Sequence, residues 1–308
     1  MRIIFLGTPD FAVASLQALI HHGLNVVAVV TAPDRPAGRG MKLQASAVKQ
    51  YALSQNLPVL QPEKLKNEAF LEELAAYKAD LQIVVAFRML PEVVWSMPPL
   101  GTINVHASLL PEYRGAAPIN WAIINGETET GVTTFRLQHA IDTGNILLQS
   151  RVAITDDDNA GTLHDKLMHE GAALLIKTIQ SLQNGTLIEH PQEANEHSKH
   201  APKLFTETCQ IDWSKSCNEV HNLIRGLSPY PAAFTMLNGK KCKVFVSKKC
   251  TEIHEGEPGS LYSDQKTYLR IPCGEGSIEI VELQTEGKTR MSIADYLRGN
   301  KINSLERK

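Results

Sequence analysis

The sequence lacks most of the motifs by which metal and cofactor sites are recognised. All five cysteines lie after residue 208 and none has C-x-x-C spacing, which argues against a zinc or dithiol redox motif. No H-E-x-x-H motif occurs. The turn after the first apolar run has only Gly7, which is too few glycines for a dinucleotide fingerprint, and Glu282 stands where a Walker A loop needs its first glycine. We therefore expect no metal and neither of these nucleotide-binding motifs.

The sequence also lacks a large net charge and a long apolar run. It has 31 Lys and Arg against 33 Asp and Glu, and 43% of its 308 residues are hydrophobic, as in ordinary globular proteins. No apolar run approaches the ~18 residues of a membrane span, and no leader peptide is evident, so we expect a soluble, cytoplasmic protein. Residues 209–308 carry 15 Lys and Arg against 12 Asp and Glu. An anionic partner and an ordinary solvated surface explain this excess of positive charge about equally well.

Short apolar runs alternate with helical patterns over residues 1–183, which we predict to form the first domain. Runs that are apolar throughout indicate strands buried on both faces, and their alternation with helices predicts an α/β fold with a mostly parallel sheet. The helix that closes this domain is predicted to begin at Thr162, with a capping-box-like Thr162-x-x-Asp165. The apolar runs span residues 2–7, 25–32, 79–87 and 101–107, and residues 132–137 and 146–154 are predicted to add later strands.

The remaining residues change in character. Residues 184–208 show no sustained periodicity, and we predict them to be a linker. Residues 209–308 contain one helical stretch near Cys217–Gly226, five short strand-like runs with a turn at Asn238-Gly239, and a helical stretch near Met291–Arg298. This pattern predicts a smaller β-barrel domain with a terminal helix.

Asn104 and His106 are polar residues at the end of an otherwise apolar run. Parallel α/β sheets bind ligands at the carboxyl ends of their strands, and residues two apart project to the same side of a strand. A buried and satisfied polar pair is the simpler interpretation of these two residues alone. Asp142, in a turn between two later runs, favours a site, because Asn, His and Asp together can polarise a carbonyl, stabilise an oxyanion and manage a proton.

Nucleophilic catalysis by a side chain is disfavoured around these residues. No cysteine lies nearby, and Ser108 lacks the G-x-S-x-G setting of a serine nucleophile. Direct attack by an amine of the substrate on an activated carbonyl is the simplest chemistry that the three residues support.

Two basic segments are candidates for contact with nucleic acid. The stretch PDRPAGRGMK at residues 33–42 carries Arg35, Arg39 and Lys42 and reads as a loop, which suits phosphate contact; a solvated loop is the alternative. Residues 240–249 contain five lysines and no acid, beginning with Lys240, Lys241 and Lys243. Because β-barrels of this kind bind nucleic-acid strands, these lysines favour RNA contact, and protection of an edge strand is the alternative.

The chain resembles the methionyl-tRNA formyltransferase family in a series of motifs that run in the same order along nearly its whole length. The resemblance implies a Rossmann-like formyltransferase domain followed by an OB-like barrel that binds tRNA. It implies 10-formyltetrahydrofolate as formyl donor and initiator methionyl-tRNA as acceptor. The motifs are GTPDFA, APDRPAGRG, INVHASLLPEYRGAAPINWAIINGETETGVT, IDTGNIL, APKL, IDWSKS, HNLIRGLSPYP and GEGSIEIVELQTEGKTRMS.

By this resemblance, Asn104 and His106 bind the formyl oxygen, and Asp142 orients His106 and helps to take the proton released by the amine. The folate-binding residues implied are Ser108, Leu109, Leu110, Pro111 and the backbone of Phe87, Arg88, Met89 and Leu90. The basic loop would meet the tRNA acceptor end.

Two departures from the family pattern affect these assignments. Phe87-Arg88 stands where relatives usually have Tyr-Gly, so Arg88 either attracts the folate glutamate or is a surface residue. Met41 replaces a further basic residue of the loop.

Two other functions stay open at this point. The shared core motifs also fit a formyltransferase for a small amine, such as glycinamide ribonucleotide or an amino sugar, and the scaffold could serve a catalytically silent RNA-binding protein. We expect a monomer, and Arg114 has no role in this scheme beyond a structural ion pair.

Overall fold

The computed structural model describes residues 1–37, 42–193, 198–250 and 256–302. The chain divides into two compact units, each assembled from several segments. Unit 1 comprises Met1–Gly115, Thr130–Val152 and His164–Lys199. Unit 2 comprises Ala116–Glu129, Ala153–Leu163 and His200–Lys308.

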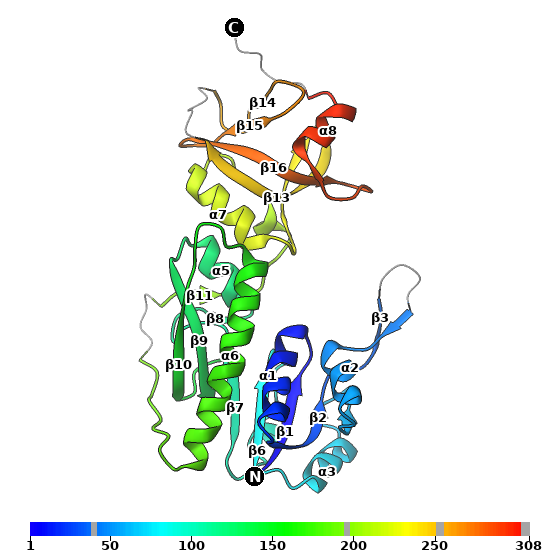
Figure 1. The fold of residues 1–308 in the computed structure, drawn as a ribbon, viewed down its shortest axis with the longest axis vertical. Coiled ribbons are helices and arrows are strands. Elements are labelled where there is room, and N and C mark those ends of the chain that lie inside the picture. Colours follow the sequence, from blue (N-terminus) through cyan, green and yellow to red (C-terminus); the bar gives the residue numbers. More distant parts are fainter. Residues whose placement is uncertain (38–41, 194–197, 251–255, 303–308) are drawn as a thin grey trace. The chain divides into compact units, whose positions relative to one another are not determined.

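Unit 1 is built around a seven-stranded sheet in the order β10-β9-β7-β6-β1-β2-β5 (Figure 1). Strand β1 pairs in parallel with β2 and β6, and β6 pairs in parallel with β7, whereas β9 runs antiparallel to β7. The mostly parallel sheet expected from the sequence is therefore confirmed. The strands are β1 Arg2–Gly7, β2 Asn25–Val30, β5 Val59–Leu60, β6 Leu81–Val85, β7 Thr102–His106, β9 Glu129–Arg136 and β10 Ile146–Ala153.

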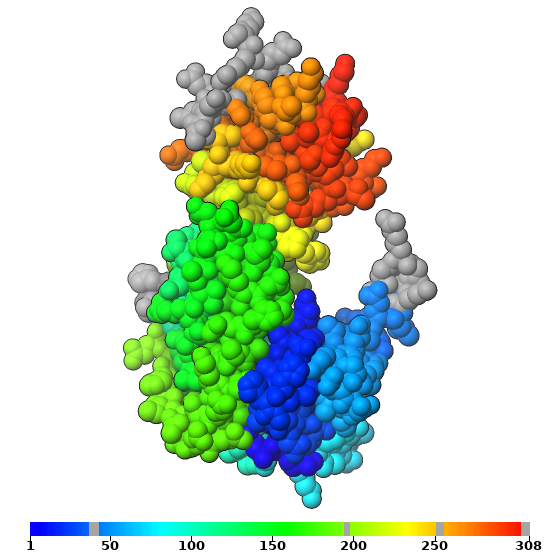
Figure 2. Space-filling model, in the orientation of Figure 1, coloured from blue at the N-terminus to red at the C-terminus, as the bar shows by residue number. Residues whose placement is uncertain are grey.

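Helices cover both faces of this sheet because its strands are apolar on both sides. The helices α1 and α6 lie side by side on one face, where the rings of Phe11 and His164 are 5.2 Å apart (Figures 1 and 2). Gly171 lets α6 lie close to the sheet, since a Cβ at this position would be 3.1 Å from a methyl group of Val105 on β7. The helices are α1 Asp10–His21, α2 Ala47–Ser54, α3 Glu68–Ala76, α4 Glu92–Trp95 and α6 Ala160–Gln183.

The start predicted for the helix that closes the first domain is wrong by two residues. Helix α6 begins at Ala160, and the side-chain oxygen of Asn159 accepts hydrogen bonds from the backbone N–H groups of Gly161 and Thr162. The hydroxyl of Thr162 instead donates to Asp158. Asn159 is therefore the residue that satisfies the free N–H groups of the first turn.

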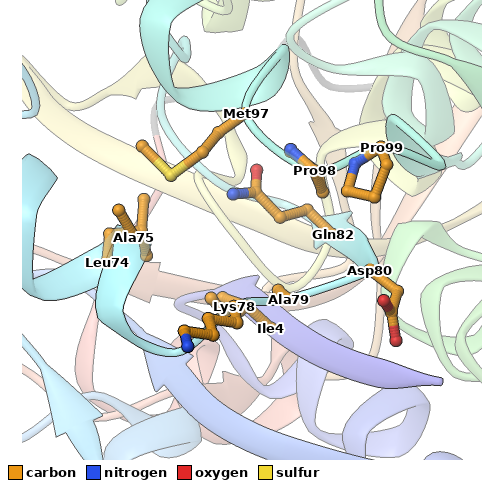
Figure 3. Close-up of a pocket in the computed structure, with 10 residues that line it drawn as sticks. All are labelled: Ile4, Leu74, Ala75, Lys78, Ala79, Asp80, Gln82, Met97, Pro98 and Pro99. Carbon is orange, nitrogen blue, oxygen red and sulfur yellow. The ribbon is translucent and has the colours of Figure 1, made fainter.

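A hollow of about 420 Å³ lies at the amino ends of β1 and β6 (Figure 3). Gln82 lies among the side chains that line it, accepts a hydrogen bond from Thr102 and has no partner for its amide nitrogen among the described residues. Parallel α/β sheets bind ligands at the opposite, carboxyl edge. The hollow is therefore separate from the residues that the sequence singles out.

Unit 2 contains an antiparallel sheet in the order β12-β13-β16-β15-β14, with β17 paired to β16. Two shifts of register between β13 and β16 disrupt the ladder locally and bend the strands. No pair among the described residues joins β12 to β14, so the sheet is partly open there. The strands are β12 Ala233–Leu237, β13 Lys240–Cys250, β14 Tyr262–Ser263, β15 Leu269–Pro272, β16 Ser277–Thr285 and β17 Met291–Ser292.

The helices of unit 2 pack on this sheet around a single apolar core. Ile224 and Leu227 from α7 are fully buried against residues such as Val244 and Ile280. Further elements are α5 Pro118–Ile124, α7 Cys217–Leu227, α8 Ile293–Gly299, the short strand β11 His200–Ala201 and the 3-10 turn Glu207–Cys209. The antiparallel second domain with its terminal helix follows the expectation from sequence.

The segment predicted as a linker is divided between the two units. Its residues up to Lys199 belong to unit 1, and those from His200 belong to unit 2. His190 exchanges two backbone hydrogen bonds of 2.8 Å with Ile146, the first residue of β10. This part of the chain is therefore held along the sheet although it has no periodic pattern. No helix among the described residues is long and apolar enough to span a bilayer.

Unit 2 holds a half-buried histidine in its neutral form. Burial, followed by the nearby cations Arg225 and Lys249, lowers the pKa of His221 from 6.5 to about 4, and its ring nitrogen Nδ1 lies 2.9 Å from the hydroxyl of Ser247. Because the unfolded chain binds this proton at about pH 6.5 and the folded chain only near pH 4, His221 makes stability fall as pH decreases through that interval.

We expect His221→Gln to reduce the loss of thermal stability between pH 7 and pH 4.5 by a few degrees, because glutamine does not titrate. The measurement is the Tm of the full chain at both pH values. His22→Gln, at the exposed end of α1, is the matched control and should follow the parent protein. An equal loss in the parent and in His221→Gln would contradict the neutral state of His221.

Candidate active site

Asn104 and His106 lie at the carboxyl end of β7, as the sequence predicts. His106 is 7% exposed, and its ring meets the edge of Phe135 with the centroids 6.4 Å apart. Asn104 is half-buried, and its side chain has no hydrogen-bond partner among the residues that the structure describes. A partly buried amide without a partner is suited to bind a ligand. The interpretation of these residues as a satisfied buried pair is therefore wrong for Asn104.

The ring of His106 is fixed by the backbone. Its Nε2 lies 3.0 Å from the carbonyl oxygen of Tyr113. A carbonyl can only accept a hydrogen bond, so Nε2 carries the proton and the neutral ring has a lone pair on Nδ1. In this tautomer no N–H group of the ring is left to donate to an oxygen of a substrate.

Asp142 faces the other nitrogen of this ring. Its Oδ2 lies 3.9 Å from His106 Nδ1, which is too long for a hydrogen bond and short enough for the carboxylate to attract a positive charge on the ring. The same oxygen accepts a hydrogen bond of 3.0 Å from the backbone N–H of Gly115. The sequence predicts that a carboxylate in this turn closes on Asn104 and His106, and the structure brings Asp142 to His106.

The loop between β9 and β10 has an unusual backbone at this point. Asp142 has a φ of 54°, in the left-handed region where Asp is among the few tolerated residues. Gly144 is required, because a Cβ there would lie 1.6 Å from the carbonyl oxygen of Arg136. The position of the carboxylate therefore depends on a loop shape that few sequences can adopt.

The turn Ser108–Pro111 is held by hydrogen bonds within unit 1. Ser108 donates from its hydroxyl to the carbonyl of Glu112 at 2.6 Å, and Thr133 binds both the Ser108 carbonyl and the Leu110 N–H. Ser108 and Leu110 are buried, while Leu109 and Pro111 are half-buried. The peptide bond between Leu110 and Pro111 is cis. Of the four predicted folate residues in this turn, Leu109 and Pro111 thus offer the accessible side chains.

The second predicted folate segment follows β6. Met89 is 70% exposed and Leu90 is buried. The guanidinium group of Arg88 donates to the carbonyl oxygens of Pro62 and of Glu63, the latter at 2.9 Å, and its carbon lies 5.7 Å from the ring centre of Phe87. Arg88 therefore joins two loops at this edge, and its contacts are those of a structural residue.

The basic stretch at residues 33–42 has more structure than the loop we predict. Its ends pair as the antiparallel strands β3, Arg35–Ala37, and β4, Lys42–Gln44. Asp34 anchors the base, since it accepts hydrogen bonds from Lys49 at 2.6 Å and Gln61 at 2.8 Å, and both lower the pKa of its carboxyl group.

The three predicted tRNA-binding residues of this hairpin are described unequally. Arg35 is exposed on β3. For Lys42 the structure describes the backbone only, and Arg39 lies outside the described residues.

The lysines of unit 2 lie on β13, which is not an edge strand because it pairs with both β12 and β16. Edge protection therefore does not explain Lys243, which lies in the part of β13 that is paired on both sides. Lys241 holds its ammonium group 3.8 Å from the ring centre of Phe234, and Lys243 donates to the carbonyl of Pro231 at 3.1 Å. Lys240 is exposed beside the turn. Two of the predicted residues thus share a face with an aromatic ring.

Sequence reasoning missed Gln192, whose amide binds the loop that carries Asp142. It lies in the aperiodic segment predicted as a linker, where no pattern singles it out.

The described residues include no group of three or more His, Cys, Asp and Glu that could hold a metal ion.

Two protein families match the chain. The Formyl transferase family matches residues 1–179, and the family described as Formyl transferase, C-terminal domain, matches residues 203–301. The chain is 54% identical to a methionyl-tRNA formyltransferase of Bacteroides fragilis over 307 residues, covering 97% of this chain and 95% of that protein. It is 55% identical to a methionyl-tRNA formyltransferase of Parabacteroides distasonis, covering 98% and 96%.

Solved structures of low sequence identity share the fold. The sugar 3N-formyl transferase WlaRD, solved with dTDP and 5-N-formyl-THF, superposes with a TM-score of 0.69 at 23% identity, covering 94% of this chain and 99% of that one. HypX from Aquifex aeolicus, solved with tetrahydrofolic acid, gives 0.67 at 19%, covering 96% and 47%. The motifs, the two units and these identities over nearly the full length agree, and the chain belongs to the methionyl-tRNA formyltransferase family.

Proposed function

We propose that the protein transfers the formyl group of 10-formyltetrahydrofolate to the α-amino group of initiator methionyl-tRNA. The observation that carries this proposal is the arrangement at the end of β7, where an amide without a partner lies beside a histidine–carboxylate pair. The names of relatives more than 50% identical over nearly the whole chain support the choice of acceptor. Formyltransferases with amino-sugar substrates share the fold at only 23–24% identity, so a small-amine acceptor is not favoured.

In this proposal Asn104 provides the hydrogen bond to the formyl oxygen. Its amide N–H groups are uncommitted, and negative charge grows on that oxygen as the amine attacks. The folate supplies an activated formyl group, and an α-amino group titrates near ~8, so part of it is neutral at physiological pH. Electrostatic stabilisation by Asn104 then lowers the barrier more than activation of the nucleophile does.

In this proposal His106 accepts the proton that the amine releases, and Asp142 stabilises the protonated ring. The Nδ1 of the neutral ring has a lone pair, because Nε2 donates to Tyr113. A proton that the attacking amine gives to Nδ1 turns the ring into a cation 3.9 Å from the Asp142 carboxylate, which stabilises it. The ring would return this proton to the folate nitrogen as the bond between that nitrogen and the formyl carbon breaks, so that tetrahydrofolate leaves. Once protonated, Nδ1 also becomes a donor that can share the charge on the formyl oxygen. The family resemblance implies that Asn104 and His106 both bind the formyl oxygen. In this proposal Asn104 can donate from the start, whereas His106 can donate only after it has taken the proton.

The residues present fit a folate molecule at the carboxyl edge of the sheet. Leu109 and Pro111 offer partly exposed apolar groups on one side, and the exposed Met89 follows β6 on another. The backbone of residues 87–90 would hold the pterin, and Arg88 would act by fixing this segment to the 62–63 loop.

Contact with tRNA is assigned to two basic surfaces. The hairpin of β3 and β4 carries Arg35, and its stem is held by the Asp34–Lys49 ion pair. The face of β12 and β13 combines Lys241 and Lys243 with the ring of Phe234, a pairing of cation and aromatic group that suits phosphates and unstacked bases. That the protein acts as a monomer in the cytoplasm stays a prediction.

Incubation of the protein with formyl-labelled folate and different acceptors tests the function directly. Label should appear on the amino group of charged initiator tRNA and not on uncharged tRNA, glycinamide ribonucleotide or amino sugars. Transfer to a small amine with none to the charged tRNA would overturn the proposed acceptor, and tRNA binding without any transfer would favour a non-catalytic RNA-binding protein.

We expect Asp142→Asn to lower kcat by about 100-fold or more, the scale of a lost acid–base group, because the amide cannot stabilise the protonated ring. Asparagine can still accept the hydrogen bond from Gly115, so the loop shape is kept. The measurement is single-turnover formylation with saturating tRNA, with Kd for tRNA as the control for folding. Asp157→Asn on the exposed surface is the matched variant, and a rate for Asp142→Asn within threefold of it would refute the assignment.

We expect Lys241→Ala and Lys243→Ala each to weaken tRNA binding and to reduce the slope of log Kd against log salt by about 1, because each lysine that contacts a phosphate releases about one counterion. Binding of charged tRNA is measured at several salt concentrations. Lys266→Ala removes an exposed lysine from another part of unit 2 and should leave the slope unchanged. Identical slopes for all three variants would remove this face from the interface.

A further inference from the structure

Arg114 and Gln192 form a hydrogen-bonded chain that ends at the backbone of Asp142. The guanidinium group of Arg114 donates from Nε and Nη2 to the side-chain oxygen of Gln192, at 3.1 and 2.5 Å. The amide nitrogen of Gln192 donates to the carbonyl oxygens of Asp142 and Gly144, at 3.0 and 2.7 Å. Gln192 thus connects an arginine that follows the Ser108–Pro111 turn to the loop between β9 and β10.

The hydrogen-bonding groups of Arg114 and of the loop allow only one orientation of the Gln192 side-chain amide. Arginine has no acceptor, so the amide oxygen must face Arg114, and carbonyls have no donor, so the amide nitrogen must face Asp142 and Gly144. Rotation of the amide by 180° would oppose donors to donors and acceptors to acceptors. All four hydrogen bonds of the Gln192 amide are therefore made within the protein, and Gln192 has none left for a substrate.

The loop needs this support because much of it is exposed. Ile141 is 63% exposed, and His139 and Ala140 are exposed as well. Asp142 itself has a left-handed backbone conformation, which costs conformational energy unless the surroundings hold it. The two carbonyl groups that Gln192 binds flank Thr143, so they fix the direction in which the Asp142 side chain leaves the backbone.

The segment Tyr113–Gly115 holds both members of the histidine–carboxylate pair. The carbonyl of Tyr113 binds Nε2 of His106, and the N–H of Gly115 binds Oδ2 of Asp142. The Arg114 side chain between them reaches the Asp142 backbone through Gln192. Three consecutive residues therefore fix the ring, the carboxylate and the loop that carries the carboxylate.

We propose that Gln192 and Arg114 are positioning residues, which hold Asp142 at its distance from His106 and thereby set the rate of proton removal. This inference rests on the proposed function for its effect on rate, and on the geometry alone for its effect on the loop. Neither residue touches the reacting groups, so both act through Asp142.

A comparison of variants in two backgrounds tests the proposal. Gln192→Ala should lower kcat for formylation about 10-fold or more and change KM for tRNA and folate less than about twofold. In the Asp142→Asn background the same change should lower kcat less than about twofold, because residues that act through one group are not additive. An equal loss of kcat in both backgrounds, or a loss that lies in KM, would overturn the proposal.

Two further variants separate positioning from a folding defect. Gln192→Glu keeps the partner of Arg114 but opposes an acceptor to the two loop carbonyls, so it should behave like Gln192→Ala with an unchanged Tm. Gln138→Ala removes an exposed amide side chain from the same loop and should leave kcat unchanged. Parental kcat in Gln192→Glu would contradict the role of the two amide donors.

Hydrogen exchange of the Gly115 amide gives a readout that does not need the proposed reaction. This N–H is bound to the Asp142 carboxylate, so release of the loop in Gln192→Ala should speed its exchange about 10-fold or more. Unchanged exchange would overturn the proposal even if formylation is observed. Faster exchange without formylation of any charged tRNA would support the positioning role and refute the proposed function instead.

Discussion

The structure of the site depends on the backbone of residues 113–115, which binds His106 and Asp142 at once. The Tyr113 carbonyl determines which ring nitrogen carries the proton, and the Gly115 N–H holds the carboxylate near the other. Because both contacts come from one short segment, the ring and the carboxylate cannot move apart independently. Arg114 extends the same support to the loop of Asp142 through Gln192.

The sheet explains why these groups meet. The carboxyl ends of β6 and β7 lie side by side, so the segments that follow them reach the same edge. The antiparallel strand β9 ends at Arg136, opposite Ile103, and the loop that follows it brings Asp142 to His106. Unit 1 thus assembles the reacting groups from the carboxyl end of β7 and from the loop between β9 and β10. Unit 2 contributes a different property, a cationic and aromatic face on an antiparallel sheet, which suits a large anionic substrate better than a small amine.

Local patterns in the sequence predict much of this fold. The first strands were recognisable because they are short and almost entirely apolar, and Asn104 and His106 could be paired because side chains alternate along a strand. Asp142 was recognisable as a carboxylate in a turn between two strands. Gln192 and the cap at Asn159 were not, because their importance comes from which groups they meet in space. The role of Arg88 was not recognisable either, because its partners at residues 62 and 63 lie far from it in the sequence.

The central claim is that neutral His106 carries its proton on Nε2 and keeps a lone pair on Nδ1 beside Asp142. Nitrogen NMR of protein labelled in the rings of its 11 histidines measures this directly, with a His106→Gln variant to assign the signals. At a pH that keeps the ring neutral, the account predicts a protonated Nε2 and an unprotonated Nδ1. A protonated Nδ1 in the neutral ring would contradict it, because the ring could then neither bind Tyr113 as described nor accept a proton beside the carboxylate.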